Sequence, residues 1–307
     1  MSDDSGSSAG NTNRRGIGLM MASMVMFTIA DSLVKVSTAT HSPAQVMLLL
    51  FGGALVLFTT MAVINGDKLF DRDALVPVLL WRYIAEIIGM VGMITALALV
   101  PISTVGAVTQ ATPILAALGA VYFLNEQIGW QRWVCIGVGF AGVLMIVQPA
   151  ASSFNSAVLW AVLALIALSV RDLTTRLVPS GMASNSLATY TMIAATPVAL
   201  VWVLVRGENL VPIDTNWFIV LPMIVSGAMG YMLLISSLRT AAVSVVMPFR
   251  YSRVVFLLGA GILVFDERPN ALMLAGAFLI VVSGAYMMHR EQLVKGVEKG
   301  AEKNSPN

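Results

Sequence analysis

A succession of apolar runs, each about 20 residues long, constrains this chain more than any other feature and fills most of its 307 residues. A helix of about 20 apolar residues is needed to cross the hydrocarbon core of a bilayer, which is about 30 Å thick. The chain is 58% hydrophobic and 11% charged, whereas a soluble domain carries about 25% charged residues. The sequence therefore predicts an all-α membrane protein.

Ten transmembrane helices are expected when a window of about 20 residues is moved along the sequence. The linkers are mostly short, and only Val100 and Pro101 separate the third span from the fourth, so neighbouring spans should form tight antiparallel hairpins. Residues 1–15 are expected to be a disordered tail, and the apolar run behind them is too long for a signal peptide, so it is an uncleaved span. The predicted spans cover residues 16–37, 43–65, 75–99, 102–124, 130–148, 157–178, 184–205, 216–238, 242–265 and 271–288, and residues 289–307 form a second tail.

The distribution of Lys and Arg predicts the orientation, because cytoplasmic loops of membrane proteins carry an excess of these residues. With the N-terminus inside, twelve of the eighteen basic residues fall on the cytoplasmic side, three fall outside and three lie within spans. Both tails are therefore expected in the cytoplasm, with the chain as a multi-pass protein of a bacterial inner membrane. The twelve are Arg14, Arg15, Lys68, Arg72, Arg132, Arg171, Arg176, Arg239, Arg290, Lys295, Lys299 and Lys303, and the three outside are Lys35, Arg206 and Arg268.

Two matches at one spacing indicate an internal repeat. Glu126 ends the fourth span in the context Tyr-Phe-Leu-Asn-Glu, and Glu267 ends the ninth in the context Leu-Val-Phe-Asp-Glu, 141 residues later. Asp31 and Asp172, near the ends of the first and sixth spans, are also 141 residues apart. Each half would hold an odd number of spans, so the second half must be inverted relative to the first. The predicted architecture is ten transmembrane helices in two inverted five-helix repeats.

Several short stretches resemble a known transporter repeat. Residues 103–113 (STVGAVTQATP), followed by Leu-Asn-Glu at 124–126 and the glycines of 137–142, resemble the EamA repeat of the drug/metabolite transporter superfamily. Residues 248–253 (PFRYSR), followed by FDERP at 265–269, resemble a second copy. One departure is that Val254 stands where the first copy has Pro113, so the resemblance does not fix where the ninth span breaks.

The resemblance implies a first EamA repeat over residues 16–148 and a second over residues 157–288. It also implies ten helices, cytoplasmic termini, a central cavity, and transport of amino acids, nucleosides or other metabolites, often outward. Within this family the chain is similar to the YddG-type amino-acid exporters.

Charged residues inside the predicted spans are candidates for a binding site, since a charge at the bilayer centre costs about 3 kcal/mol or more unless it is paired or faces water. Arg82 and Glu86 lie four residues apart on the third span, so they can neutralise each other. Glu86 and Arg253 both lie about 16 Å into their spans, near the midplane, at a rise of about 1.5 Å per residue. Arg250 lies three residues before Arg253 and shortly after Pro248, whose missing N–H frees a backbone carbonyl.

Positive charge is in excess at the midplane, with three arginines against the single acid Glu86. Asp31, farther toward the periplasmic end, can offset part of this excess or pair with Lys35 on its own helix. A guanidinium presents a planar fork that suits a carboxylate, so an anionic or zwitterionic substrate is expected, with tyrosines and a glutamine as further polar contacts. The candidate substrate-binding residues are Asp31, Arg82, Tyr83, Glu86, Gln110, Tyr231, Arg250, Tyr251 and Arg253.

A structural interpretation of these charges stays open, because ion pairs between buried helices are often part of the scaffold. Glu126 and Glu267, at span ends, are expected to bind orphan N–H groups or loop arginines rather than substrate. Cys135 has no thiol partner and is expected to serve packing only. Close helix contacts are expected at Gly137, Gly139, Gly142, Gly276 and Gly284.

The expected function is that of a secondary transporter which exports amino acids by alternating access through a central cavity, since no ATP-binding loop is present. The alternatives are an intramembrane lipid-modifying enzyme and a non-transporting helical accessory protein. The enzyme is disfavoured because His41 and His289 are the only histidines and no catalytic couple or metal cluster appears. No cofactor and no nucleic acid are expected. The expected partners are the lipid bilayer and a small metabolite with a carboxylate or another anionic group, and the sequence does not indicate an oligomeric state.

Overall fold

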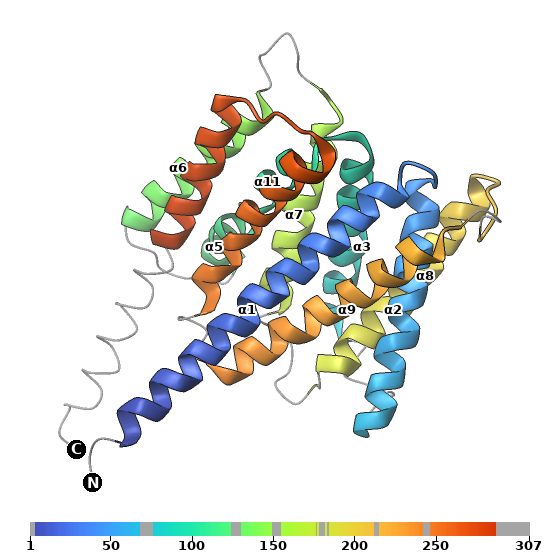
Figure 1. Cartoon of the computed structure of the whole chain (residues 1–307), viewed down its shortest axis with the longest axis horizontal. Coiled ribbons are helices and arrows are strands. Elements are labelled where there is room, and N and C mark those ends of the chain that lie inside the picture. Colours follow the sequence, from blue (N-terminus) through green and yellow to red (C-terminus); the bar gives the residue numbers. More distant parts are fainter. Residues whose placement is uncertain are drawn as a thin grey trace.

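Figure 1 shows the fold in a computed structural model of the chain. The structure describes residues 4–67, 76–123, 130–148, 155–175, 177, 182, 184–211, 215–241 and 246–286, and every regular element in these ranges is helical. The elements are α1 (Asp4–Ser37), α2 (Pro43–Asn65), α3 (Pro77–Leu99), α4 (Ile102–Thr109), α5 (Thr112–Phe123), α6 (Trp130–Val147), α7 (Val158–Thr175), α8 (Ser184–Val205), α9 (Trp217–Thr240), the 3-10 helix η2 (Met247–Tyr251), α11 (Ser252–Phe265) and a last helix, Ala271–Tyr286.

Each of the ten predicted spans coincides with a described helical segment when α4 with α5, and η2 with α11, are counted as one segment each. Six of the described helices are long and apolar enough to cross a bilayer, and three shorter ones are also apolar. The N-terminus differs from expectation, since α1 begins at Asp4, inside the tail expected to be disordered. A nucleated helix adds residues at little cost, so α1 extends beyond its apolar part. The predicted C-terminal tail lies outside the described residues.

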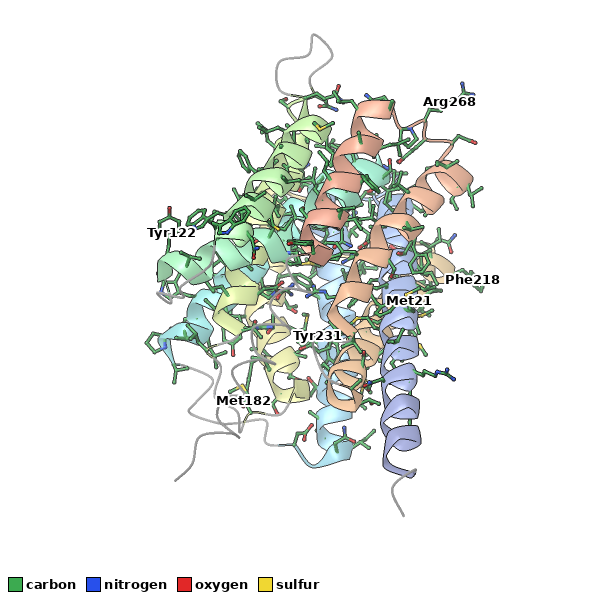
Figure 2. The ribbon with its side chains drawn as sticks, turned by 90° about the vertical axis from the view of Figure 1, so that its left-hand side faces the viewer. Met21, Tyr122, Met182, Phe218, Tyr231 and Arg268 are labelled. Atoms are coloured by element: carbon green, nitrogen blue, oxygen red, sulfur yellow. The ribbon has the colours of Figure 1, made fainter. Side chains whose placement is uncertain are left out.

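Large apolar side chains cover the outside of the helices. Phe218 is 93% exposed and Leu263 is 84% exposed, although both belong to regular helices. In Figure 2, Phe218 of α9 and Tyr122 of α5 point away from the bundle. Exposed apolar surface on this scale is unfavourable in water, whereas lipid tails are as apolar as these side chains. Helix length, hydropathy and this outer surface together identify an all-helical membrane protein.

The α1–α2 turn is tied to the loop that follows α8. Ser42 caps α2 and forms a capping box with Gln45, whose side-chain amide donates to the carbonyl of Asn209. Ser42 Oγ also donates to Glu208, which pairs with Arg206. Burial raises the pKa of Glu208, but the hydrogen bonds from Ser42 and Arg206 outweigh it and hold that pKa below its ordinary value. This carboxylate therefore stabilises the loop in its ionised form.

Successive helical segments run in alternating directions through the bundle (Figure 1). The main contacts join the two halves of the chain: α1 packs along α9, α3 along α7, α2 along α8, and α4 against α11. At the contact between α6 and the last helix, a Cβ on Gly276 would lie 2.6 Å from the carbonyl oxygen of Gly142. Close contacts of this kind are what small residues provide between membrane helices.

The expectation of close helix packing is confirmed at four of the five glycines. A Cβ on Gly139, Gly142, Gly276 or Gly284 would come within 2.7 Å of a neighbouring atom. The expectation is wrong for Gly137, where a Cβ would meet no atom within 4 Å because the position faces outward.

Two helices are interrupted inside the bundle, and the interruptions meet. α4 ends at Thr109 and α5 begins at Thr112, so the predicted fourth span is broken around Gln110. The predicted ninth span starts its described part as the 3-10 turn η2 and becomes α-helical only at Ser252. Gln110 Nε2 donates to the carbonyl oxygen of Arg250 over 3.1 Å, which fastens one break to the other. Polar backbone at a helix break is tolerated in a membrane only where protein or water surrounds it.

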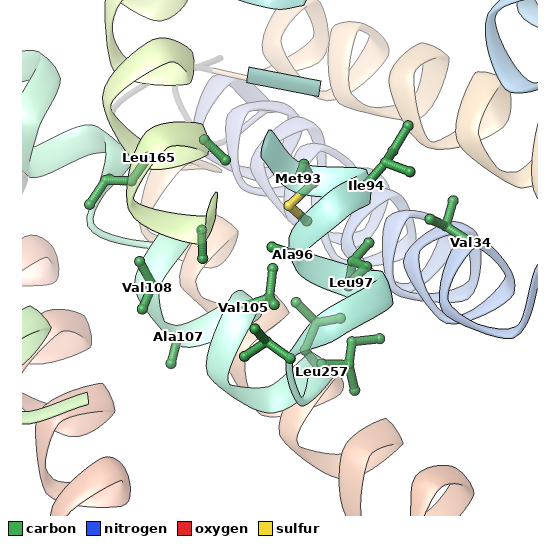
Figure 3. Close-up of a cluster of buried hydrophobic side chains, with 14 of the residues drawn as sticks. Val34, Met93, Ile94, Ala96, Leu97, Val105, Ala107, Val108, Leu165 and Leu257 are labelled. Carbon is green, nitrogen blue, oxygen red and sulfur yellow. The ribbon is translucent and has the colours of Figure 1, made fainter. Parts of the chain in front are cut away.

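A buried apolar cluster supports this region from one side (Figure 3). Ile94 and Leu97 of α3 pack there with Val105 of α4 and Leu257 of α11, all at most 1% exposed. The cluster holds α3, α4 and α11 in fixed positions.

Candidate functional site

Asp31 and Asp172, the two aspartates that share the repeat spacing, both contact arginines of one helical turn. Asp31, on α1, accepts a hydrogen bond from Nη2 of Arg253, at the start of α11. The guanidinium of Arg253 also lies over the ring of Phe27, 5.3 Å from its centroid. Charge and aromatic face together fix this guanidinium between α1 and α11.

Asp172, on α7, is shared by two arginines. Its Oδ1 lies 2.8 Å from Nε of Arg171, and its Oδ2 lies 4.0 Å from Nη2 of Arg250 in η2. The contact with Arg250 is too long for a hydrogen bond. Nε of Arg171 makes no hydrogen bond to Asp172 either, so Asp172 forms ion pairs with both arginines and the closer pair is with Arg171.

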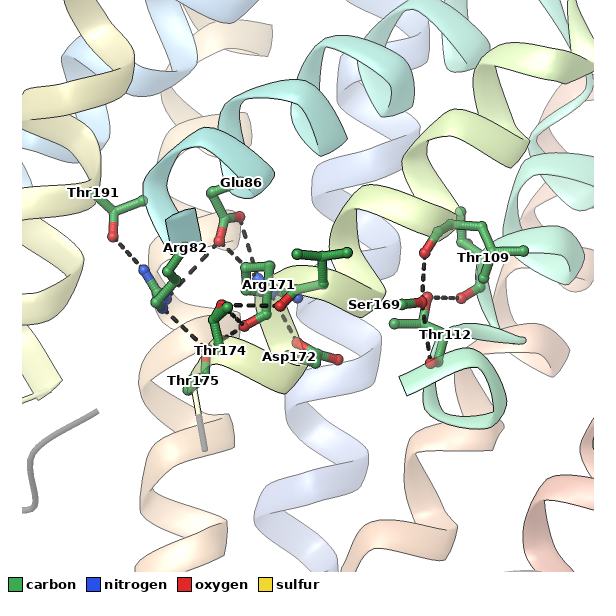
Figure 4. A network of polar contacts seen from close by, with 12 residues as sticks. Arg82, Glu86, Thr109, Thr112, Ser169, Arg171, Asp172, Thr174, Thr175 and Thr191 are labelled. Carbon is green, nitrogen blue, oxygen red and sulfur yellow. Dashed lines mark hydrogen bonds and ion pairs between the residues drawn. The ribbon is translucent and has the colours of Figure 1, made fainter. Parts of the chain in front are cut away.

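Glu86 continues the network toward α3 (Figure 4). Its two carboxylate oxygens accept hydrogen bonds of 3.0 Å and 3.2 Å from Nη1 of Arg171. The expected pair with Arg82 exists, but Nη2 of Arg82 lies 3.9 Å from Glu86. Arg82 instead donates to the hydroxyl oxygens of Thr175, over 3.0 Å, and Thr191, over 2.7 Å. The expectation that Arg82 and Glu86 can pair is therefore confirmed, but Arg171 approaches Glu86 more closely.

Among the described residues, this layer of charge holds four arginines and three acids. The four arginines are Arg82, Arg171, Arg250 and Arg253, and the three acids are Asp31, Glu86 and Asp172. The arginines exceed the acids by one, whereas the sequence indicates three arginines and one acid at the midplane. The side chains of Arg171, Asp172, Arg250 and Arg253 are between 23% and 26% exposed. Charged groups cannot face lipid tails at low cost, so this exposed polar surface is suited to water or a polar solute.

Two of the other candidate residues join this network. Gln110 binds the backbone of Arg250, as described above. Tyr231, on α9, stacks edge-on against Phe58 with ring centroids 5.4 Å apart, and it lies within electrostatic range of Arg82 and Arg171.

The remaining two tyrosines are directed into packed regions. Tyr83 is 7% exposed and packs in an apolar cluster with Leu187. Tyr251 is 3% exposed, and its hydroxyl occupies the space that a Cβ on Gly284 would need. Their side chains support the helices around the network.

Lys35 and Glu267 form a separate tie at one end of the bundle. Glu267 accepts hydrogen bonds from the backbone N–H groups of Ile102 and Ser103, over 2.6 Å and 3.0 Å, and from Ser103 Oγ. The expectation that Glu267 binds orphan N–H groups is therefore confirmed, and the groups belong to the first turn of α4. Lys35 lies 3.8 Å from Glu267 and donates to the carbonyl of Val100, so it does not serve as the partner of Asp31. Glu126 lies outside the described residues.

Arg171 and Asp172 are the residues that the sequence does not point to as part of a site. The charge pattern places Arg171 on the cytoplasmic side, yet its side chain lies inside the bundle against Glu86. The signal that could have found this pair is the register shared by Asp172 and Asp31, because equivalent positions of a repeat lie at equivalent depths. No group of three metal-binding side chains occurs among the described residues.

Comparison with known proteins matches this architecture to one family. The model of the EamA-like transporter family matches residues 14–148 and again residues 155–288. A crystal structure that is 15% identical covers 89% of this chain and 95% of its own, with a TM-score of 0.56, which supports the fold alone.

Characterised relatives handle different small molecules. An S-adenosylmethionine uptake transporter from Rickettsia bellii is 26% identical, over 90% of this chain and 94% of its own length. A pseudopaline exporter from Pseudomonas aeruginosa is 26% identical, over 88% of this chain and 94% of its own. A riboflavin transporter from Vibrio cholerae is 28% identical, over 69% of this chain and 71% of its own. With two matches to the family model that cover most of its length, the chain belongs to the EamA-like transporter family and is a membrane transporter of small metabolites, not an enzyme.

Proposed function

We propose that this chain is a secondary transporter that exports amino acids across the bacterial inner membrane by alternating access. The observation that carries the proposal is the layer of charge between α1, α3, α7, η2 and α11. Inside an otherwise apolar bundle, four of its side chains are about a quarter exposed: those of Arg171, Asp172, Arg250 and Arg253. A charge inside a membrane protein is costly unless it is paired or faces water, and the partial exposure of these paired side chains favours a polar solute as their function.

Both signs of charge are accessible in this layer, which favours amino acids over other small metabolites. Arg250 offers a guanidinium group for a carboxylate, and Asp172, with a side chain 24% exposed, offers an acceptor for an ammonium group. Gln110 and Tyr231 lie beside these charges and supply polar groups for a side chain. The names of the relatives given above include both uptake and export, so the outward direction rests on the sequence resemblance.

Alternating access requires two halves that rock around a fixed site, and the helix pairing fits two inverted repeats. In two such repeats α1 corresponds to α7, and α3 corresponds to α9. The contact of α1 with α9 is therefore equivalent to the contact of α7 with α3, and the structure contains both contacts. The contacts of α2 with α8 and of α4 with α11 map onto themselves. Segments α1 and α7, which begin the two halves, run in opposite directions (Figure 1).

Cytoplasmic termini complete the proposed topology. The bias of basic residues motivates this orientation: eleven fall on the cytoplasmic side against three outside, once Arg171 is counted inside the bundle. A reporter that is active only in the cytoplasm should work when it is fused after residue 307, and a reporter that is active only in the periplasm should not. Activity of a reporter that works only in the periplasm would contradict the topology and the even number of spans.

The transport proposal is tested with purified protein in liposomes that are loaded with a mixture of labelled L-amino acids. Efflux of at least one amino acid should exceed the leak from protein-free liposomes. Arg171→Gln, which removes the group shared by Glu86 and Asp172, should slow efflux, whereas Arg268→Gln, which removes the same charge from an exposed loop, should not. If no amino acid leaves faster than from empty liposomes, the proposed substrate class is wrong.

A further inference from the structure

We infer that the two neighbouring arginines of this layer have different roles: Arg250 binds the anionic group of the substrate, and Arg253 is a structural tie. The inference rests on the proposed transport function and names the group that recognises the substrate. It also narrows the substrate to a molecule that presents one carboxylate, or a similar singly charged anion, to Arg250.

Arg253 is already neutralised. Its Nη2 donates to Asp31, which has a side chain only 13% exposed, and its guanidinium lies over Phe27. Its Nε is buried, so this edge of the guanidinium is closed to a ligand. A substrate anion at Arg253 would have to displace Asp31 and leave that buried carboxylate without its partner, which is costly.

Arg250 has no such partner among the described residues. The guanidinium of Arg250 lies 4.0 Å from the carboxylate of Asp172. Arg171 lies closer to the same carboxylate, at 2.8 Å. Arg171 also neutralises Glu86. Two acids thus serve three arginines in this part of the network.

Arg82 and Arg250 are the two described arginines of this layer that lack a close carboxylate partner, and of these two a ligand can reach Arg250. The side chain of Arg82 is 5% exposed and donates to two threonine hydroxyls, so a ligand cannot reach it. Arg250 is 26% exposed on its side chain. The bond from Gln110 to its backbone carbonyl holds η2 in place, which orients the guanidinium before a ligand arrives.

The chemistry of this site follows from the charge count. A carboxylate placed on Arg250 would give this guanidinium the close charged partner that it lacks, and the planar guanidinium can donate two parallel hydrogen bonds to it. An uncharged amide of the same shape would leave the excess charge in place. The site should therefore separate an acid from its amide.

The experiment uses the purified full chain and a panel of L-amino acids and simple monocarboxylates, each with its primary amide. Binding is measured as ligand-induced thermal stabilisation and confirmed by calorimetry. At least one acid should stabilise the parent while its amide does not. Arg250→Gln should weaken binding of that acid about 10- to 150-fold, the loss of a hydrogen bond to a charged group, with an unfolding temperature close to the parent's.

Arg253→Gln should show the opposite behaviour. It should lower the unfolding temperature, Asp31→Asn should lower it similarly, and the double variant should lose less than the sum of the two, because the same ion pair is broken. At a temperature where it stays folded, Arg253→Gln should bind the acid within a few-fold of the parent. Arg268→Gln is the matched control, with parent-like stability and binding.

Three results would overturn the inference: equal stabilisation by an acid and its amide, undiminished binding of the acid to Arg250→Gln, or no stabilisation by any carboxylate in the panel. These outcomes differ from failure of the proposed function. If no amino acid is transported but a monocarboxylate stabilises the parent through Arg250, then amino-acid export is wrong and the assignment of Arg250 stands.

Discussion

Replacing Glu267 by Gln tests the tie between the start of α4 and the end of α11. The carboxylate accepts hydrogen bonds from two backbone N–H groups, of Ile102 and Ser103, and from the Ser103 hydroxyl, and it lies 3.8 Å from Lys35. The amide keeps one acceptor oxygen but turns an NH2 group toward the remaining donors. A hydrogen bond to a charged acceptor contributes about 1.5–3 kcal/mol and a neutral one about 0.5–1.5 kcal/mol.

The expected loss follows from these values. The bond that remains loses about 1 kcal/mol because its acceptor is no longer charged, and at least one further bond is lost entirely, so Glu267→Gln should reduce the free energy of unfolding by about 2–4 kcal/mol. The side chain is 9% exposed, so screening by solvent should not remove the effect. For a chain of this size, 1 kcal/mol changes the unfolding temperature by about 2–4 °C, so a decrease of about 5–15 °C is expected.

The assay is thermal unfolding of the purified, monodisperse protein, followed by the fluorescence of its six tryptophans. Asp266→Asn is the matched control, because it removes the same charge at the neighbouring, exposed position, and Asn tolerates the positive φ of 51° found there. This control should unfold at the parent's temperature. If Glu267→Gln also unfolds within about 2 °C of the parent, the substitution changes the free energy of unfolding by less than about 1 kcal/mol, which would refute the assigned role.

Three further predictions concern packing, the lone cysteine and pH. Gly276→Ala should cost about 1–3 kcal/mol of stability in the same unfolding assay, because its Cβ would lie 2.6 Å from the carbonyl oxygen of Gly142, whereas Gly137→Ala, which meets no atom, should not destabilise. Cys135→Ser should preserve transport in liposomes with at most modest destabilisation, since the thiol is buried and unpaired; loss of transport by folded protein would contradict this. The pKa of Glu208 is lowered from 4.5, so its stabilisation should be complete above about pH 4.5 and disappear as pH falls through the lower, folded-state pKa. Unfolding temperatures of the parent and Glu208→Gln should therefore differ at pH 7 and converge in acid; a constant difference would oppose the assignment.

The helices were predictable from sequence because a bilayer allows few alternatives. A segment that crosses hydrocarbon must satisfy all its backbone groups internally, so each long apolar run becomes a helix of nearly fixed length. The place where the ninth span is interrupted was not predictable. The first copy has its proline, Pro113, at the position of Val254, whereas the proline of the second copy, Pro248, comes six residues earlier. The structure begins α11 at Ser252 because η2, which contains Pro248, turns as a 3-10 helix first.

The candidate site was predictable only in part, because depth in the membrane does not specify partners. Arg82 and Glu86 are four residues apart and do approach each other, yet Glu86 is held more closely by Arg171 from another helix. Arg171 lies near the end of an apolar run, where span boundaries are uncertain by several residues, so the count of basic residues placed it on the cytoplasmic side. Glu267 was expected to bind a helix end, and it does, but the end belongs to the other half of the chain.

The site gains its charge from a departure from the repeat. At the spacing of 141 residues that relates Asp31 to Asp172, the counterparts of Arg250 and Arg253 are Thr109 and Thr112. The hydroxyls of these threonines are satisfied by backbone carbonyls of α4: Thr109 Oγ1 donates to the carbonyl of Val105, and Thr112 Oγ1 donates to the carbonyl of Thr109. Ser169 in turn donates to the carbonyl of Thr112 (Figure 4). Equivalent aspartates therefore face arginines from the second half only. If both breaks carried the same residues, they would hold either no arginine or twice as many. In this arrangement one partly exposed guanidinium, that of Arg250, lacks a close carboxylate partner among the described residues, which is what recognition of one carboxylate requires.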